Sequence, residues 1–393
     1  MVFAFRSAVS RLTPSLAVFL GGATLGMTHS NVARAEEKRD LRDLEFGVPH
    51  DRKRVDPFSP FFPSDKHPCT HAGMFIPGCH ELKIFSGSSH FELADDIARR
   101  LGTRVGKITL GRFADGEVQV QVGESVRGKD VYLVQSLASP VNDNIIELLL
   151  MVSTMRRASA KKVTVVLPYY AYKHHRRANP AATSLNSKFI QSPAADIAKM
   201  LEVMGVDRVI AVDMQMRVEG HEACFFSSDI PVETIETIMA GVEYFATQVY
   251  LRRPLVVMAP NPEKRRGEES HADIVGDVKG ADVIVVDDLI DTSGTLSKLT
   301  NLALSRGARR VYCFASHPLL NGDAERLIEE SNVSQVVVMD TIPADPKAFH
   351  TDKLKRLSVA PMLAELIQAE HFKAHSYIDK VNSREDFKYV HHY

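Results

Sequence analysis

One stretch, residues 283–295, constrains the fold of this chain more than any other. It reads VIVVDDLIDTSGT. Its first four residues are β-branched and apolar with no polar alternation, which is typical of a strand buried on both faces of a parallel sheet. Ligands bind in open α/β folds where such strands end. We therefore expect a ligand site at the carboxyl end of this run.

The residues after the run suit a sugar phosphate. Asp287 and Asp288 would repel a phosphate, but they suit sugar hydroxyls or the shell of a magnesium ion. Behind them we expect a turn whose backbone N–H groups and hydroxyls converge at the start of a helix, an arrangement that cradles phosphate. The turn residues are Thr292, Ser293, Gly294 and Thr295.

An acidic strand end followed by an ordinary helix cap is the alternative, because Asp and Thr are good capping residues. The next segment argues against it. Leucines at 296, 299, 302 and 304 predict a helix over residues 295–305, and Gly307 ends it before a strand at 310–315. Strand, loop, helix and strand make one βαβ unit.

The same alternation runs through most of the chain and predicts an α/β fold with parallel, doubly wound sheets. The first sheet is predicted from strands at 83–87, 131–135, 163–167 and 209–212, with helices at 91–101, 143–155 and 194–204. The second is predicted from strands at 255–258, 283–286, 311–315 and 336–339. We divide the chain into residues 1–80, 81–230 and 231–393.

The loop DDLIDTSGT resembles the ribose-phosphate binding loop of the type I phosphoribosyltransferases. Residues 82–366 as a whole resemble one family among them, the ribose-phosphate pyrophosphokinases (PRPP synthetases). The motifs follow the family's order: IFSGSSH at 84–90, FADGE at 113–117, ESVRGKDVYLVQS at 124–136, IVGDVKG at 274–280 and TIPADPK at 341–347. The resemblance implies two similar phosphoribosyltransferase-like domains, each a mostly parallel sheet flanked by helices, after a disordered N-terminal extension.

The resemblance also implies a reaction: transfer of pyrophosphate from ATP to the C1 hydroxyl of ribose 5-phosphate, giving PRPP and AMP for nucleotide biosynthesis. By it, Asp287 and Asp288 hold ribose hydroxyls, and Asp291 joins the turn residues 292–295 around the 5-phosphate. Mg²⁺ is the implied cofactor, in a homo-oligomer or a hetero-oligomer of related subunits. A neighbouring subunit supplies part of the adenine contacts.

Nucleotide contacts are implied for Phe113, Asp115 and Glu117, although Phe113 could instead be a core aromatic. Where the family has Tyr-Ala-Arg-Gln-Asp, this chain has Tyr172 to Arg176. His174 and His175 therefore stand in a basic run that could meet the polyphosphate of ATP or be a solvated loop.

The metal positions depart from the family's pattern. Gln215 stands where the family has a metal-binding histidine, and Asn261 replaces the aspartate of a Pro-Asp-x-Gly-Gly loop, so both would be weak ligands. Residues 261–282 show no crossover helix, which two parallel neighbouring strands need. This pattern predicts that a βα unit is missing. We assign Lys264 and Arg266, in the basic trio there, to covering the charge that develops in catalysis.

Three explanations of this gap stay open: a segment lost from the gene model, a tolerated deletion, and a divergent non-catalytic subunit. Such a subunit would bind ligands and assemble with active synthetases. A salvage phosphoribosyltransferase is a weaker alternative, because it would share DDLIDTSGT without needing two α/β halves or FADGE.

Composition excludes some classes of function. With 393 residues and a formal net charge of -1, the chain is not expected to bind nucleic acid through bulk electrostatics. Its four cysteines are too few and too scattered for a disulfide framework, so reduced thiols are expected. The apolar stretch at 16–25 is short and interrupted by glycine, so no stable membrane insertion is expected.

The N-terminus differs from the rest. Residues 1–35 carry three arginines and no acidic residue, and they are rich in Ser, Thr and Ala, which favours an organellar transit peptide for a mitochondrion or plastid. The alternatives are a secretory leader ending near Ala35, and an uncleaved tail or a wrongly chosen start codon on a cytoplasmic protein. Residues 37–80 are charged and proline-rich, as in a linker.

Overall fold

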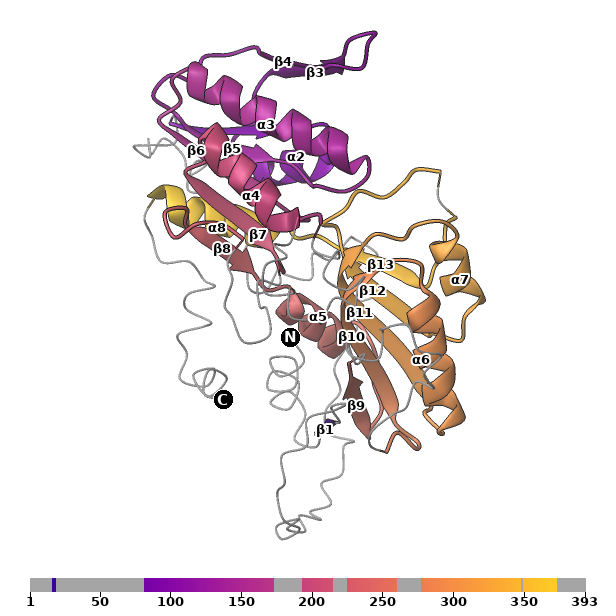
Figure 1. Cartoon of the computed structure of the whole chain (residues 1–393). Coiled ribbons are helices and arrows are strands. Elements are labelled where there is room, and N and C mark those ends of the chain that lie inside the picture. The colour runs from indigo at the N-terminus through magenta and orange to yellow at the C-terminus, as the bar shows by residue number, and fades with distance from the viewer. Residues whose placement is uncertain are drawn as a thin grey trace, which may run out of the picture.

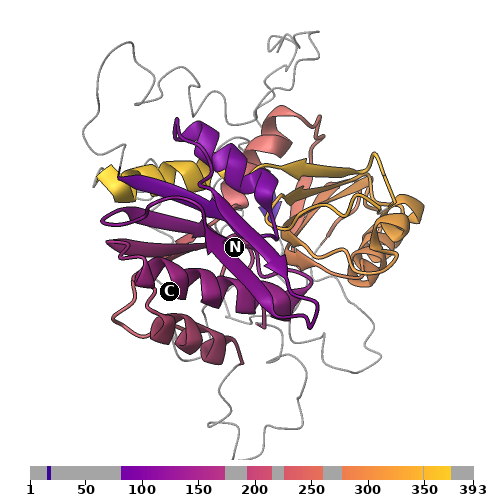
Figure 2. The same ribbon diagram turned by 90° about the horizontal axis from the view of Figure 1, so that it is seen from above.

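The computed structural model describes residues 16–18, 81–172, 193–214, 225–259, 277–347 and 349–372, the first of these ranges by its backbone alone. These residues form two parallel sheets with helices on their faces, and a separate hairpin (Figures 1 and 2). The predicted α/β class is confirmed.

The N-terminal sheet has five parallel strands in the order β2-β5-β6-β7-β8. Their bounds are β2 Leu82–Ser86, β5 Asp130–Val134, β6 Lys162–Leu167, β7 Arg208–Val212 and β8 Val232–Ile235. Helices α3 (Val141–Arg157) and α4 (Pro193–Met204) pack on one face, and α2 (Phe91–Arg100) on the other. Side chains alternate between the faces, so Val163 and Val165 pack with α3 and α4 while Val166 joins the core under α2.

The C-terminal sheet has six parallel strands in the order β1-β9-β10-β11-β12-β13. Their bounds are β1 Leu16–Val18, β9 Leu255–Met258, β10 Asp282–Ile290, β11 Arg310–Pro318, β12 Gln335–Met339 and β13 Leu354–Leu357. Helix α6 (Gly294–Ser305) packs on one face, beside α7 (Ala324–Glu330), and α5 (Ile238–Thr247) on the other. Gly241 lets α5 approach closely, since a Cβ there would lie 2.6 Å from the Phe314 ring.

A single hydrophobic core joins the two sheets. It contains Ile97 of α2, Phe245 of α5 and Phe314 of β11. It also contains Leu363 and Ile367 of α8 (Ala360–Phe372), the last described helix. Although α8 follows the C-terminal sheet in the chain, it lies beside α2 and covers the N-terminal sheet (Figure 1). The two α/β halves therefore share their packing as well as a peptide link.

The predicted strands and helices are found, with ends that differ by a few residues. The largest difference is in β10, because the ladder with β11 continues through Asp287 and Leu289 to Ile290 instead of ending at residue 286. The two carboxylates thus belong to the strand itself. The sequence prediction missed the hairpin strands β3 (Ile108–Arg112) and β4 (Val118–Val122) as well as β1, β8, β13, α5, α7 and α8.

Candidate active site

The predicted phosphate turn forms the junction between β10 and α6. Ser293 caps α6 in the left-handed conformation, with φ of 61° and ψ of 0°, and accepts a hydrogen bond from the backbone N–H of Ser297 through its carbonyl. Its side chain is only 4% exposed, yet its hydroxyl makes no hydrogen bond to the protein. A buried hydroxyl without a partner is uncommon and needs an explanation such as a ligand. A residue in the left-handed conformation followed by the start of a helix is a backbone arrangement that binds anions. This turn has both features.

The two aspartates before this turn differ in their surroundings. Asp288 is buried at 6% exposure, while Asp287 is half-buried. Alternation along β10 places them on opposite faces of the sheet: Asp287 follows Val283 and Val285 toward α6, and Asp288 follows Val286 toward the N-terminal half. A sugar lying across the end of the strand could reach a carboxylate from each face.

The carboxylate of Asp291, the third acidic residue of the segment, accepts a hydrogen bond from the amide of Asn321 at 2.8 Å. The backbone N–H groups of Leu319 and Leu320 both donate to the carbonyl of Ile290, at 2.9 and 3.2 Å. The loop after β11 therefore fixes the start of the phosphate turn.

The N-terminal half contributes a side chain that the sequence analysis missed. Tyr169, just after β6, packs edge-on against the ring of His317 at the end of β11, with centroids 5.2 Å apart. Burial, followed by the charges of Asp291 and Asp288, raises the pKa of Tyr169 to about 12, so its hydroxyl stays protonated at neutral pH. The signal was a tyrosine directly behind a buried strand and a proline, where parallel sheets place functional groups.

Hydrogen bonds hold the halves in register at this point. The hydroxyl of Thr341 lies 3.0 Å from Nδ1 of His317 and donates to the carbonyl of Ser316 at 3.0 Å. The hydroxyl of Ser136 donates to the carbonyl of Thr341 at 2.8 Å, and Nε2 of His90 lies 2.9 Å from the carbonyl of Asp340. Motifs far apart in the sequence thus meet behind the phosphate turn.

Asp213, which follows β7 with a positive φ of 41°, has a structural role. It is buried, and its carboxylate accepts hydrogen bonds from the backbone and hydroxyl of Thr237. The Thr237 hydroxyl also lies 2.9 Å from that of Ser316. Burial raises the pKa of Asp213. This carboxylate links α5 and β11 to the end of the N-terminal sheet.

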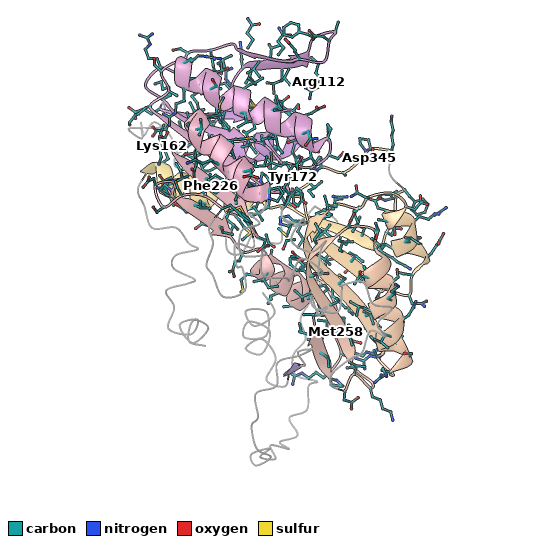
Figure 3. The ribbon with its side chains drawn as sticks, in the orientation of Figure 1. Arg112, Lys162, Tyr172, Phe226, Met258 and Asp345 are labelled. Carbon is teal, nitrogen blue, oxygen red and sulfur yellow. The ribbon has the colours of Figure 1, made fainter. Side chains whose placement is uncertain are left out.

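The FADGE residues lie elsewhere, at the tip of the β3–β4 hairpin, which projects from the N-terminal half away from β10 and α6 (Figure 1). The turn is closed by a hydrogen bond from the backbone N–H of Phe113 to the carbonyl of Glu117, at 2.8 Å. Asp115 and Glu117 are exposed, and Phe113 is 52% exposed, which excludes the alternative of a core aromatic within this chain. Figure 3 shows the separation between Arg112, the last residue of β3 in the hairpin, and Met258 in the C-terminal sheet.

The other predicted site residues lie outside the described ranges. They are His174, His175, Gln215, Asn261, Lys264 and Arg266. Tyr172, the last described residue before the basic run, lies where the two halves meet (Figure 3). Its φ is 64°, and its hydroxyl donates to the side chain of Asn142.

The described residues contain no group of three His, Cys, Asp or Glu side chains able to hold a metal ion. The carboxylate oxygens of Asp287, Asp288 and Asp291, which precede the predicted phosphate turn, have the hard character that Mg²⁺ prefers. Among helices in the same part of the chain, none combines the length and apolar character needed to cross a bilayer.

The chain is similar to known proteins over most of its length. Residues 82–205 match the model of the N-terminal domain of ribose phosphate pyrophosphokinase, and residues 247–378 match the phosphoribosyl synthetase-associated domain. The chain is 38% identical to the ribose-phosphate pyrophosphokinase of Buchnera aphidicola subsp. Acyrthosiphon pisum, over 73% of this chain and 95% of the relative. It is 36% identical to that of Ralstonia nicotianae, over 72% and 93%.

A solved structure shows the same architecture. The phosphoribosylpyrophosphate synthetase of Mycobacterium smegmatis superposes with a TM-score of 0.64 at 31% identity, covering 75% of this chain and all of the other. The match spans both halves, as the motif order predicted. This chain belongs to the ribose-phosphate pyrophosphokinase family.

Proposed function

We propose that this protein transfers the diphosphoryl group of ATP to the C1 hydroxyl of ribose 5-phosphate, giving PRPP and AMP. The C1 oxygen attacks the β-phosphorus, the bond from that phosphorus to the oxygen of the α-phosphate breaks, and the hydroxyl proton is released. One observation carries the proposal. Ser293, in the left-handed conformation at the start of α6, has a buried hydroxyl that makes no hydrogen bond to the protein, and it follows the carboxylates of Asp287 and Asp288 in the chain.

The roles of the sugar site follow from its geometry. The 5-phosphate lies against the backbone N–H groups and hydroxyls of residues 292–295, and Ser293 gains the hydrogen bond that it lacks. Asp287 and Asp288 accept hydrogen bonds from ribose hydroxyls at the end of β10 and so orient C1. Asp291, held by Asn321, completes the turn.

We assign nucleotide binding to the β3–β4 hairpin. Phe113 offers an exposed ring for the adenine, and the carboxylates of Asp115 and Glu117 suit its amino group or the ribose of ATP. Since the hairpin projects away from the same chain's phosphate turn, we assign it to the active site of a neighbouring subunit. We assign His174 and His175 to contacts with the polyphosphate, and Lys264 and Arg266 to neutralising the developing charge.

Mg²⁺ is the cofactor that we assign. When bound, it neutralises the polyphosphate and polarises the phosphorus under attack. Asp287 and Asp288 offer oxygen donors that fit it, and Gln215 and Asn261 offer weaker amide oxygens. With few anionic protein ligands to hold it, the ion would depend on substrate phosphates and water for its other ligands.

The test is formation of AMP and PRPP by the full chain, given ATP, ribose 5-phosphate, magnesium and phosphate. We expect turnover that Asp287→Ala abolishes and that Asp352→Ala, at an almost fully exposed carboxylate, leaves unchanged. Ser293→Ala should raise KM for ribose 5-phosphate about tenfold, the value of one hydrogen bond to a charged group. Binding of ribose 5-phosphate without turnover would contradict the proposal and favour a non-catalytic subunit.

A further inference from the structure

The outer edge of the C-terminal sheet shows a feature that catalysis does not explain. Strand β9 has the character of an interior strand, since all four of its side chains are apolar and at most 7% exposed. One side of β9 pairs with β10. On the other side, the only strand among the described residues is β1, which pairs in parallel over Leu16↔Leu255, Ala17↔Val256 and Val18↔Val257.

The sequence gives the reason why this edge needs a partner. A strand left open presents a row of unpaired N–H and C=O groups, and proteins normally protect such rows with charges, proline or a covering segment. Consecutive strands are usually neighbours in a sheet, so a strand that covers the outer side of β9 would be expected to follow β9 directly in the chain. Residues 261–282 lack the period of a crossover helix, and the next strand, β10, takes the inner side.

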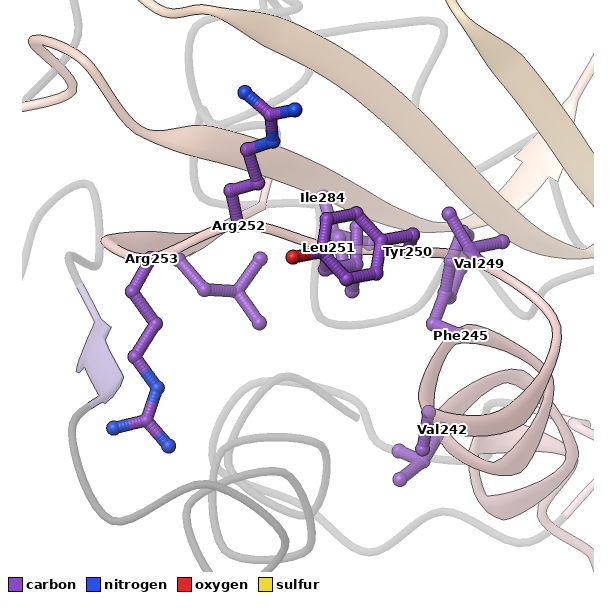
Figure 4. A pocket seen from close by; sticks show the side chains of 10 residues that line it. Val242, Phe245, Val249, Tyr250, Leu251, Arg252, Arg253 and Ile284 are labelled. Atoms are coloured by element: carbon purple, nitrogen blue, oxygen red, sulfur yellow. The ribbon is translucent and has the colours of Figure 1, made fainter. Parts of the chain in front are cut away.

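An apolar pocket lies beside this edge (Figure 4). Val242 and Phe245 of α5 form one wall, Ile284 of β10 contributes to the floor, and Arg252 and Arg253 stand at the rim. The segment 250–253 is fixed there, because the backbone N–H of Arg252 donates to the buried carboxylate of Asp282 at 2.7 Å. Tyr250 is 78% exposed beside it. Apolar surface of this kind is normally covered in a soluble fold.

The N-terminal segment has the chemistry to cover it. Residues 16–20 read LAVFL and carry no charge, and β1 already lies on the Arg253 side of the pocket (Figure 4). We propose that the segment around Leu16–Val18 is a permanent edge strand of the working protein, which completes the C-terminal sheet in place of the absent crossover unit. It is then retained in the mature chain, in contrast to the removable leader that the composition of residues 1–35 suggests.

The experiment compares three full-length proteins by amide hydrogen exchange. The first is the parent, and the second carries Ala17→Pro and Val18→Pro. N–H groups of a strand alternate in direction, so one of these prolines removes a donor aimed at β9. The control carries the same two changes at the only other Ala-Val pair in the segment, Ala8→Pro and Val9→Pro.

We expect exchange in residues 255–258 to become at least about tenfold faster in the Ala17/Val18 variant and to stay unchanged in the control, while residues 311–315 of β11 stay protected in all three. Equal exchange at β9 in all three proteins would overturn the proposal. Protection of β9 that persists in the variant and depends on protein concentration would also overturn it, and would indicate a second copy on this edge.

A second measurement uses the protein from its native source. Trypsin releases residues 12–34 as one peptide, because arginines stand at 11 and 34. Finding that peptide in the mature protein supports the retained strand. A mature N-terminus at or beyond Glu36 overturns it. Neither measurement uses catalytic activity, so their outcome is separate from that of the proposed reaction.

Discussion

At the residue scale, the neighbouring tyrosines after β6 have opposite surroundings. Tyr169 faces the carboxylates of the phosphate turn across the junction of the two halves. Tyr170 points into the N-terminal core, and its hydroxyl donates to the carbonyl of Ala194 at 2.6 Å. Two adjacent residues of the same type thus serve different halves of the molecule.

Their substitution should separate binding from stability. We expect Tyr169→Phe to raise KM for ribose 5-phosphate about three- to tenfold, because a protonated hydroxyl beside the sugar site is lost. Tyr170→Phe should lower the free energy of unfolding by about 1 kcal/mol and leave that KM unchanged. Steady-state kinetics and urea unfolding measure the pair. An equal effect of both changes on KM would contradict a role for Tyr169 at the site.

Asp340 makes stability depend on pH. Burial above all raises the pKa of its carboxyl from 3.8 to about 6, and the nearby charge of Asp96 adds to the rise. The folded protein therefore holds this proton more tightly than the unfolded chain does. The resulting stability is present in full below the unfolded pKa of 3.8 and is lost as pH rises through about 6.

Asp340→Asn should remove this dependence. Relative to the variant, the parent should lose on the order of 1 kcal/mol of unfolding free energy between about pH 4 and pH 7, after allowance for screening by solvent. Urea titrations of both proteins across this range measure the difference. Parallel pH profiles would show that Asp340 titrates alike in the folded and unfolded states.

At the element scale, helix α8 packs in the core that the two halves share. Its residues Leu363 and Ile367 are fully buried in the core that runs from α2 to β11. The side chain of Lys162 in β6 forms an ion pair with Glu370, near the end of α8. A helix that follows the C-terminal sheet therefore stabilises the N-terminal one.

Truncating α8 in the core should destabilise both sheets. We expect Leu363→Ala to cost about 2–5 kcal/mol, through lost burial and a residual cavity. Hydrogen exchange should accelerate in β5 as well as in β11. Leu327→Ala on α7, where the side chain is 38% exposed, is the matched control and should cost much less. Acceleration confined to one sheet would mean that the halves unfold independently.

At the scale of the whole molecule, the β3–β4 hairpin projects away from β10 and α6 of the same chain (Figure 1). The proposed function therefore assigns the hairpin to the active site of a neighbouring subunit. In a two-fold pair, each site then combines the hairpin of one subunit with the turn of the other.

Mixing two inactive variants tests this arrangement. The Phe113→Ala variant should be inactive because its hairpin lacks the ring assigned to adenine. The Asp287→Ala variant should be inactive because its proposed sugar site lacks a carboxylate. After subunit exchange in a 1:1 mixture, half of the pairs are mixed, and each mixed pair has one intact site. We therefore expect recovery of about a quarter of the parent activity. Absence of recovery, with exchange confirmed by mass, would place both residues in a site formed by one chain.

The sequence alone determined the fold class, most elements of both sheets and the turn between β10 and α6. These depend on local patterns: apolar runs of strand length, helical periodicity, and a hydroxyl-rich turn behind Asp287 and Asp288. The ends of β10 were wrong because a ladder with β11 can carry polar residues in a strand beyond its apolar run. Helices α5 and α8 were missed since their apolar faces make sense only against partners distant in the chain.

Only the tertiary structure decided which residues meet. It brought Tyr169 to the phosphate turn, used Asp213 as a link between the halves, and separated Phe113 from the sugar site. It also placed β1 beside β9, although the sequence marked that segment as a leader. The physical reason is that hydrophobic patterning fixes which face of an element is buried, whereas contacts between elements depend on how distant faces pack together.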